Sequence, residues 1–341
     1  MRFSFSLLLP FISYTLIAQT LGGRAAFNFV QLPATPLLTA AGGINISLPN
    51  NEVGLANYNP ALLTPSLSKH FNVSFSPFAE GVKSYSLTAA YELKKSATVF
   101  GAQVFYMDYG SIPQADAGGN VSGTFRPKDF VVQGSASRAY LQKWRYGATI
   151  KFINSSYQQY RANAFAVDVG VLYKDSANGL SAAVLSKNVG FEGKTYAGEK
   201  EDLPFDLQVG VTKRLEKAPF AFSITLQHLQ NFDINYSDTV FNIDNNNKYD
   251  KTALHKIFTH FIFATHIFLG NNLEATLGYN VLRRDQLKVG SVANGLTGFS
   301  GGLRIKFQKL QLLYSVSSYQ KNVLFNHFGI TMQLDQMGIL L

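Results

Sequence analysis

The chain has 341 residues, no cysteine and a formal net charge of +9. Without cysteine it has neither disulfides nor thiolate metal ligands. No dense basic tract carries interleaved aromatic residues, which disfavours a nucleic-acid partner. The modest positive charge suits contact with anionic lipid or lipopolysaccharide, or an ordinary solvated surface. Beyond the N-terminus there is no apolar run of about twenty residues, which excludes a membrane protein built of α-helices.

The N-terminus carries the one continuous apolar run of the chain. Arg2 precedes the mostly apolar residues 3–17, and Ala18 and Gln19 follow them. A positive charge, an apolar stretch and a small residue are typical of a secretory signal peptide, so we expect residues 1–18 to be removed. The alternative is a short buried helix. A lipoprotein signal would need a cysteine.

Residues 19–69 do not alternate cleanly, and they are rich in small residues and proline, as in Leu32-Pro33-Ala34-Thr35-Pro36 and Asn59-Pro60-Ala61. A barrel of about fourteen strands has a lumen that must be filled or left open. We therefore predict that this segment is a plug inside the lumen, with Asn59, Pro60 and Ala61 as its recognisable motif. A small subdomain outside the barrel is the alternative, but the segment is too short for a core of its own.

From residue 70 to residue 341, apolar and polar residues alternate in runs of about ten. In residues 220–227, for example, Phe220, Phe222 and Ile224 share one face, while small or polar side chains occupy the other. This pattern predicts an all-β fold, a transmembrane antiparallel β-barrel of about fourteen strands. The expected strands begin near Phe71, Ser84, Ala97, Lys128, Lys143, Asn163, Gly179, Pro204, Pro219, Lys256, Asn271, Thr297, Lys309 and Val323.

The connections between these strands are mostly short and long in turn. Residues 93–96 and 215–218 make tight turns, whereas residues 109–127 and 231–255 make long loops. Outer-membrane barrels have short periplasmic turns and long outside loops. We therefore expect an outer-membrane location, with extracellular loops and periplasmic termini. The long loops are the best candidates for protein contacts.

Ionisable residues recur on the inward face of the expected strands. They could line a conduction path, but such residues more often pair across a lumen or hold a plug in place, and we expect pairing. The candidates are Lys151, Asp168, Asp206, Glu274, Arg304 and Lys306.

Two short motifs match the residue patterns of enzyme signatures but lack the sequence context that those enzymes need. The sequence around Ser300 fits Gly-x-Ser-x-Gly, but that nucleophile needs a strand, a turn and a helix, followed by an acid and then a histidine. Here His327 precedes Asp335, and a strand pattern follows Ser300. The sequence Ser66-Leu67-Ser68-Lys69 fits Ser-x-x-Lys but lacks a later Lys-Thr-Gly. We expect no enzyme.

Metal sites are not expected either. His260 and His266 share a strand face but stand roughly 20 Å apart, too far to share an ion. The loop at residues 244–250 loosely resembles a calcium loop, but Tyr249 stands where an EF-hand needs glycine and His255 where it needs an acid. A solvated loop tip is the favoured interpretation, with calcium as the alternative. We expect no cofactor.

Short stretches in a fixed order run through nearly the whole mature chain. They are Gly22-Gly23-Arg24-Ala25-Ala26-Phe27-Asn28-Phe29, Leu32-Pro33, Ala41-Gly42-Gly43, Asn59-Pro60-Ala61-Leu62-Leu63, Lys187-Asn188-Val189-Gly190, Leu203-Pro204-Phe205-Asp206-Leu207-Gln208-Val209-Gly210, Gln227-His228-Leu229, Leu296-Thr297-Gly298-Phe299-Ser300-Gly301-Gly302 and Asn326-His327-Phe328-Gly329-Ile330. This ordered set resembles the PorQ-type proteins of the type IX secretion system of Bacteroidetes, which are similar to PorV proteins and to long-chain fatty-acid transporters.

The resemblance implies a non-catalytic component of the secretion and surface-attachment machinery. It implies PorV-, PorU- and PorZ-like proteins as partners, together with lipopolysaccharide. The alternative function is an outer-membrane transporter of hydrophobic small molecules, suggested by the hatch-like N-terminal segment and the expected strand count. A serine hydrolase at Ser300 is a third and weaker hypothesis.

Overall fold

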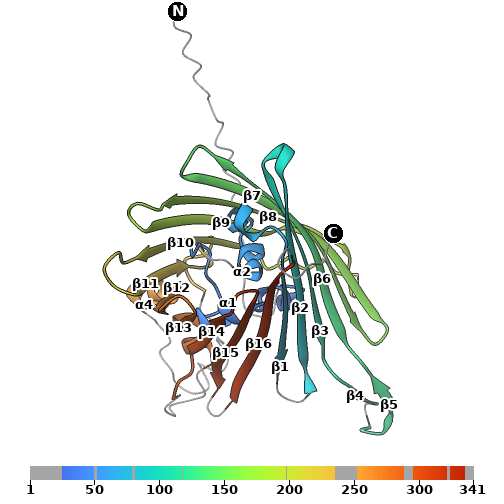
Figure 1. Cartoon of the computed structure of the whole chain (residues 1–341). Coiled ribbons are helices and arrows are strands. Elements are labelled where there is room, and N and C mark those ends of the chain that lie inside the picture. The colour runs from blue at the N-terminus through green and yellow to red at the C-terminus, as the bar shows by residue number, and fades with distance from the viewer. Residues whose placement is uncertain are drawn as a thin grey trace, which may run out of the picture.

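The structure is a computed structural model that describes residues 25–49, 52–78, 81–116, 118–196, 198–234, 252–287, 295–320 and 323–334. The expected signal peptide lies outside these residues. Fourteen strands close into one antiparallel barrel in which neighbours along the chain pair with each other (Figure 1). The predicted all-β barrel is therefore confirmed.

The barrel strands are β1 (His70–Pro77), β2 (Lys83–Leu93), β3 (Thr98–Asp108), β6 (Lys128–Tyr140), β7 (Trp144–Tyr157), β8 (Tyr160–Asp175), β9 (Leu180–Lys194), β10 (Asp206–Arg214), β11 (Phe220–Leu226), β12 (Phe261–Leu269), β13 (Leu273–Asn280), β14 (Phe299–Lys306), β15 (Leu310–Gln320) and β16 (Val323–Gln333). Two further strands, β4 (Ile112–Ala115) and β5 (Val121–Phe125), form a separate hairpin in the connection between β3 and β6. Two short helices, α4 (Ala253–Phe258) and α5 (Val281–Gln286), lie in later connections.

Barrel closure comes from the pairing of β1 with β16, which sets Phe75 opposite Phe328. Strand starts agree with the predicted ones to within a few residues, except that the strand expected near Lys256 begins at Phe261, after helix α4. Short turns such as residues 141–143 gather at one end of the barrel, here called the short-turn end. The opposite end carries the β4–β5 hairpin and is called the long-loop end (Figure 1).

The outer wall is apolar, as lipid contact requires. Neighbouring strands carry aromatic side chains that touch each other in a row near the long-loop end. Phe75 packs against Tyr85, Tyr85 against Tyr106, and Phe152 against Phe165, with ring centroids 5.2, 6.3 and 5.2 Å apart. Such girdles sit at the interfaces of outer-membrane barrels. None of the helices among the described residues is long and apolar enough to span a bilayer.

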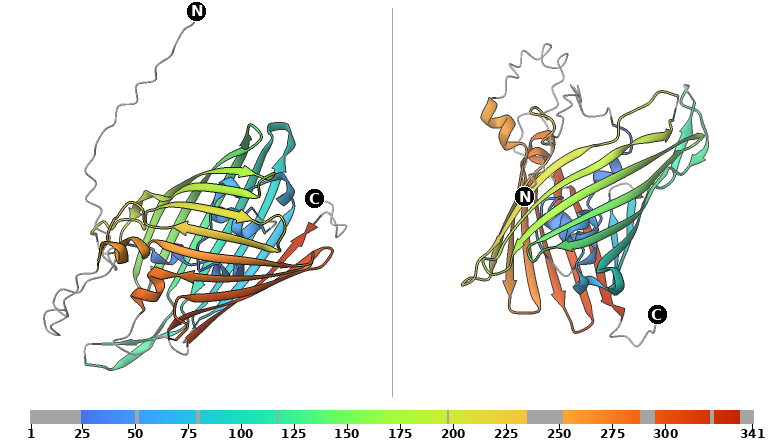
Figure 2. Two further views of the ribbon diagram at one scale, coloured as in Figure 1. Left: turned by 90° about the vertical axis from the view of Figure 1, so that its left-hand side faces the viewer. Right: turned by 90° about the horizontal axis from the view of Figure 1, so that it is seen from above.

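Residues 25–49 and 52–67 lie inside the barrel and are together called the luminal segment (Figure 2). Their side chains form a buried core with lumen-facing side chains of the wall. The segment consists of the turns η1 (Asn28–Gln31), η2 (Pro60–Leu62) and η3 (Pro65–Leu67) and the helices α1 (Pro36–Ala40) and α2 (Val53–Tyr58). Side chains cap both helices: the Thr35 hydroxyl accepts from the Leu38 amide, and the Glu52 carboxylate accepts from the amides of Gly54 and Leu55.

The luminal segment begins and ends at opposite ends of the barrel. The Ala26 amide donates to the carbonyl of Asp202, which lies in the connection between β9 and β10 at the long-loop end. Turn η3 leads into β1 at the short-turn end, where Leu334 also lies, because its amide donates to Lys69. The chain therefore runs lengthwise through the lumen before it enters the wall.

Glycines of the wall make room for this segment. A Cβ added at Gly147 of β7 would stand 2.6 Å from the Pro60 carbonyl carbon, and one at Gly210 of β10 would stand 2.7 Å from Ile46. Contacts this short are not tolerated, so the luminal segment packs this closely against the wall only because these positions lack a side chain. The other lumen-facing glycines of this kind are Gly101, Gly170, Gly278, Gly302 and Gly329.

The replacement Gly147→Ala tests this fit. We expect it to lower the free energy of unfolding by about 1–3 kcal/mol, because the new methyl group overpacks against the Pro60 backbone. The control is Gly134→Ala on the neighbouring strand β6, where an added Cβ meets nothing within 4 Å. Urea unfolding of the protein in lipid vesicles, followed by circular dichroism, measures both. Equal stability of the two variants would contradict the close fit.

Candidate functional site in the barrel lumen

The Asn59-Pro60-Ala61 motif lies at the centre of the luminal segment and is fully buried. The Asn59 side chain accepts from the Ala61 amide at 3.0 Å and donates to the Ile46 carbonyl at 2.8 Å, so it ties two turns of the segment together. Pro60 is the first residue of turn η2, a position at which the backbone N–H that proline lacks is not needed. The motif thus holds the shape of the segment against β7 and β8.

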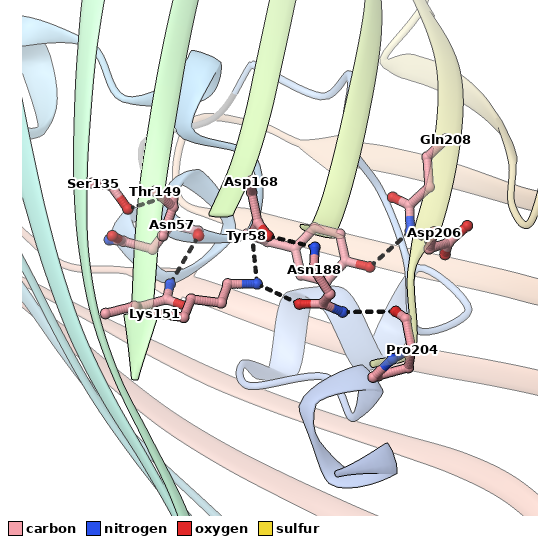
Figure 3. Close-up of polar contacts among 11 residues, drawn as sticks. Asn57, Tyr58, Ser135, Thr149, Lys151, Asp168, Asn188, Pro204, Asp206 and Gln208 are labelled. Carbon is pink, nitrogen blue, oxygen red and sulfur yellow. Dashed lines mark hydrogen bonds and ion pairs between the residues drawn. The ribbon is translucent and has the colours of Figure 1, made fainter. Parts of the chain in front are cut away.

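A buried ion pair joins two neighbouring strands beside this motif. The Lys151 ammonium on β7 lies 2.6 Å from a carboxylate oxygen of Asp168 on β8, and both side chains are almost fully buried. Lys151 also donates to the Asn188 side chain at 2.8 Å (Figure 3). Both residues were predicted to face inward, and the structure brings them together within the wall.

Asn188 completes this network because the wall is irregular there. Its φ of 58° is left-handed, a conformation that asparagine tolerates better than most residues. The pairing of β8 with β9 shifts register at this point, which is a β-bulge. The bulge turns Lys187 and Asn188 inward together, so the Asn188 amide donates to Asp168 and its side chain donates to the Pro204 carbonyl.

Asp206 links the wall to the luminal segment. Its carboxylate accepts from the Gln208 side chain at 2.6 Å and from the His228 amide at 2.6 Å. Gln208 also donates to the Tyr58 hydroxyl at 3.2 Å (Figure 3).

The other three predicted residues lie toward the short-turn end. Glu274 on β13 and Arg304 on β14 form a buried ion pair, and Glu274 also lies 3.9 Å from His266. Lys306 is partly exposed and lines a cavity of about 490 Å³ at that end. The six predicted luminal residues therefore separate into two clusters along the barrel.

A second cavity, of about 320 Å³, lies between the luminal segment and the long-loop end. Lys187, Asp206 and His228 line it from the wall side, and Arg283 lines it from helix α5. Its apolar lining comes from both the segment and the later connections, as Leu32, Pro33, Ile44, Leu282 and Leu287. Its size falls within the usual range for small-molecule sites, about 300–1,000 Å³.

The lumen wall is apolar near the long-loop end, a feature that the expected alternation does not predict. Phe29 of the luminal segment stacks on Phe105, with ring centroids 6.4 Å apart, and Phe27 packs against Tyr196. The wall residues of this apolar patch are buried, and they are Phe105, Met107, Val131, Ile153, Ala162, Ala164 and Ala166. The sequence could have revealed this patch. In runs such as 104–107 and 131–132, both strand faces are apolar and the alternation breaks down.

Ser300 and His327 both face the luminal segment. The Ser300 hydroxyl donates to the Ala40 carbonyl, and His327 contacts the Thr39 hydroxyl at 2.9 Å, so each binds the luminal segment. Residues 244–250 and Asp335 lie outside the described residues. Among the residues that the structure describes, no three His, Asp or Glu side chains gather as metal ligands.

No family model and no curated protein matches the chain. Solved structures that resemble it include the CymD monoaromatic hydrocarbon channel, which is 14% identical with a TM-score of 0.52 over 90% of this chain and 99% of that chain. The TodX monoaromatic hydrocarbon channel, as a deltaS2 mutant, is 13% identical with a TM-score of 0.51 over 88% and 97%. The likeness shows a shared outer-membrane barrel fold, and the resemblance to PorQ-type proteins stays a prediction.

The pair of Lys151 and Asp168 can be tested by single and double replacement. We expect Lys151→Met and Asp168→Asn each to lower the free energy of unfolding by about 3–5 kcal/mol, because either leaves a buried charge without its partner. The double variant should lose less than the sum. The control is Lys143→Met. Lys143 pairs with Asp175 at the short-turn end, and the Lys143 side chain is half exposed. Additive losses in urea unfolding would contradict the pairing.

Proposed function

We propose that the protein binds small hydrophobic molecules and carries them through the outer membrane. The observation that supports this best is the apolar patch inside the lumen. The lumen of a water-filled porin is polar, because apolar surface raises the free energy of the water beside it. An apolar wall at the long-loop end instead favours an apolar solute over water.

The luminal segment supports binding rather than open diffusion. The luminal segment fills the middle of the barrel, and Phe27 and Phe29 cover the apolar patch. Phe27 has a φ of 58°, a left-handed conformation that costs free energy in a bulky residue and must be held by its surroundings. A solute that displaced these two rings would cover the same apolar surface of the patch. Displacement would therefore not leave that surface exposed to water.

Replacement of the patch tests this function. We expect the double variant Val131→Thr and Ile153→Thr to slow the entry of the neutral fluorescent probe N-phenyl-1-naphthylamine several-fold in cells that produce the protein. The reason is that two hydroxyl groups in the apolar wall disfavour the probe. The control is the opposite change, Thr149→Val, on β7, the strand that also carries Ile153. An entry rate that is the same with and without the protein would refute the proposal, provided that the barrel is folded.

The second candidate function is a non-catalytic part of the type IX secretion and attachment machinery. The ordered set of PorQ-like stretches favours it, and the β4–β5 hairpin offers a projecting surface on which Ile112 and Val121 are exposed. On this proposal the long-loop end faces outward and meets PorV-, PorU- or PorZ-like partners and lipopolysaccharide. Loops on a rigid scaffold are where such contacts usually reside.

A pull-down from outer membranes separates the two candidates. We expect a chain in which a Gly-Ser turn replaces residues 111–126 to lose any PorV-, PorU- or PorZ-like partner, because the projecting surface is gone. A chain with the same Gly-Ser residues inserted in the turn at 141–143 should keep it. If the unmodified protein brings down none of these partners, the secretion function fails.

A further inference from the structure

Positive charge is concentrated at the short-turn end of the barrel. The structure describes every residue of the six short turns, and Glu216 is the only acidic residue in them. The basic residues of these turns are Lys94, Lys95, Lys143, Lys217 and Lys309. The long-loop end differs, since the connection between β9 and β10 carries three acidic residues at positions 199–202 and one lysine. The short-turn end is therefore the end suited to a negatively charged partner.

Three more cations face into the lumen at the mouth of this end. They are Lys174 of β8, Arg214 of β10 and Lys306 of β14, and all three line the cavity of about 490 Å³. Each stands an even number of residues from a lumen-facing charged residue of its own strand, so the alternation of the strand directs it inward. Lys174 and Arg214 are exposed in the mouth, and Lys306 is half-buried.

The other charged groups that line this cavity are already paired. Asp175 is the one carboxylate among the described lining residues, and it lies 2.8 Å from the Lys143 ammonium. Arg304 also lines the cavity, and it pairs with Glu274. These two pairs cancel, so the cavity keeps the positive charge of the three inward cations.

The surroundings of the three cations do not neutralise them. The Arg214 guanidinium lies 4.2 Å from the centre of the Phe268 ring, which is a neutral partner. Glu274 attracts Lys306, but Arg304 and Arg214 repel it. Within the described part of the chain, no carboxylate forms an ion pair with any of the three. Like charges that share a cavity repel each other, and an anion placed between them removes that repulsion.

The placement of these cations distinguishes between kinds of anion. Lipid head groups surround the barrel from outside, whereas the three side chains face into the lumen. One small ion fills little of the space, because the cavity of about 490 Å³ is many times the roughly 30 Å³ that a water molecule occupies. The lysines of the short turns add charge beyond the cavity. A chain with several carboxylates matches both the cavity and the turns around it.

We propose that the short-turn mouth is a docking site for an acidic segment of a soluble protein. Its carboxylates bind Lys174, Arg214 and Lys306, while the lysines of the short turns attract it from solution. The inference goes beyond the proposed function, which concerns apolar solutes within the lumen. On the expected orientation this mouth opens to the periplasm, so the partner is a periplasmic protein that stands where a carried solute meets the aqueous phase.

A peptide of six glutamates tests this docking site. The protein in phosphatidylcholine nanodiscs is titrated into fluorescein-labelled hexaglutamate, and fluorescence anisotropy reports binding. We expect the double variant Arg214→Gln and Lys306→Gln to weaken binding roughly fivefold or more, because two charge pairs are lost. The control removes the same charge from exposed lysines at the long-loop end, by Lys194→Gln and Lys200→Gln, and should bind like the unmodified protein. Added salt should weaken binding to the unmodified protein.

Other outcomes overturn the inference. It fails if hexaglutamate does not bind the unmodified protein, or if the control loses as much affinity as the double variant. It also fails if pyrophosphate displaces the peptide at an equal or lower concentration, since the site then takes a small anion. If native mass spectrometry shows that the unmodified protein retains phosphatidylglycerol and the double variant does not, the cations bind lipid instead.

The double variant must be folded for this comparison, and a heat-shift gel verifies it. We expect it to fold, because neither Arg214 nor Lys306 forms an ion pair with a residue that the structure describes. None of these outcomes depends on whether a neutral probe enters cells, so the docking site and the proposed function can fail separately.

Discussion

Every feature of this protein depends on the requirement that no backbone amide or carbonyl may face lipid without a hydrogen-bond partner. Strands meet that requirement only when the sheet has no edge, so β1 must pair with β16. Closure then fixes two environments, hydrocarbon outside and an enclosed space within. The aromatic row therefore faces the hydrocarbon, and the polar residues face the enclosed space.

The enclosed space is filled by a hydrophobic core that the luminal segment shares with the wall. Glycines on the wall, such as Gly147 and Gly210, let the luminal segment approach closely. Polar side chains then satisfy the groups that this approach buries, as Asn59 does for Ile46 and Ala61. Lys151 and Asp168 play a similar part. The filled lumen shields both charged groups from water, and each neutralises the charge of the other.

The barrel could be predicted from the sequence because lipid enforces an alternation with a period of two residues on every strand. The same rule placed Lys151, Asp168 and Asp206 on the inner face. It could not pair them, since a pair depends on the register between strands and on the bulge at Asn188, both of which are long-range properties. The prediction failed at Lys256, where apolar residues on a short exposed helix imitate the start of a strand.

The lengthwise path of the luminal segment has a consequence for how the molecule is made. This segment is synthesised before any strand, yet it ends up enclosed by all fourteen. The seam between the first strand and the last forms only when the whole chain is present, and such distant pairings are slow to establish. The enclosure of the luminal segment is therefore complete only when that seam has closed.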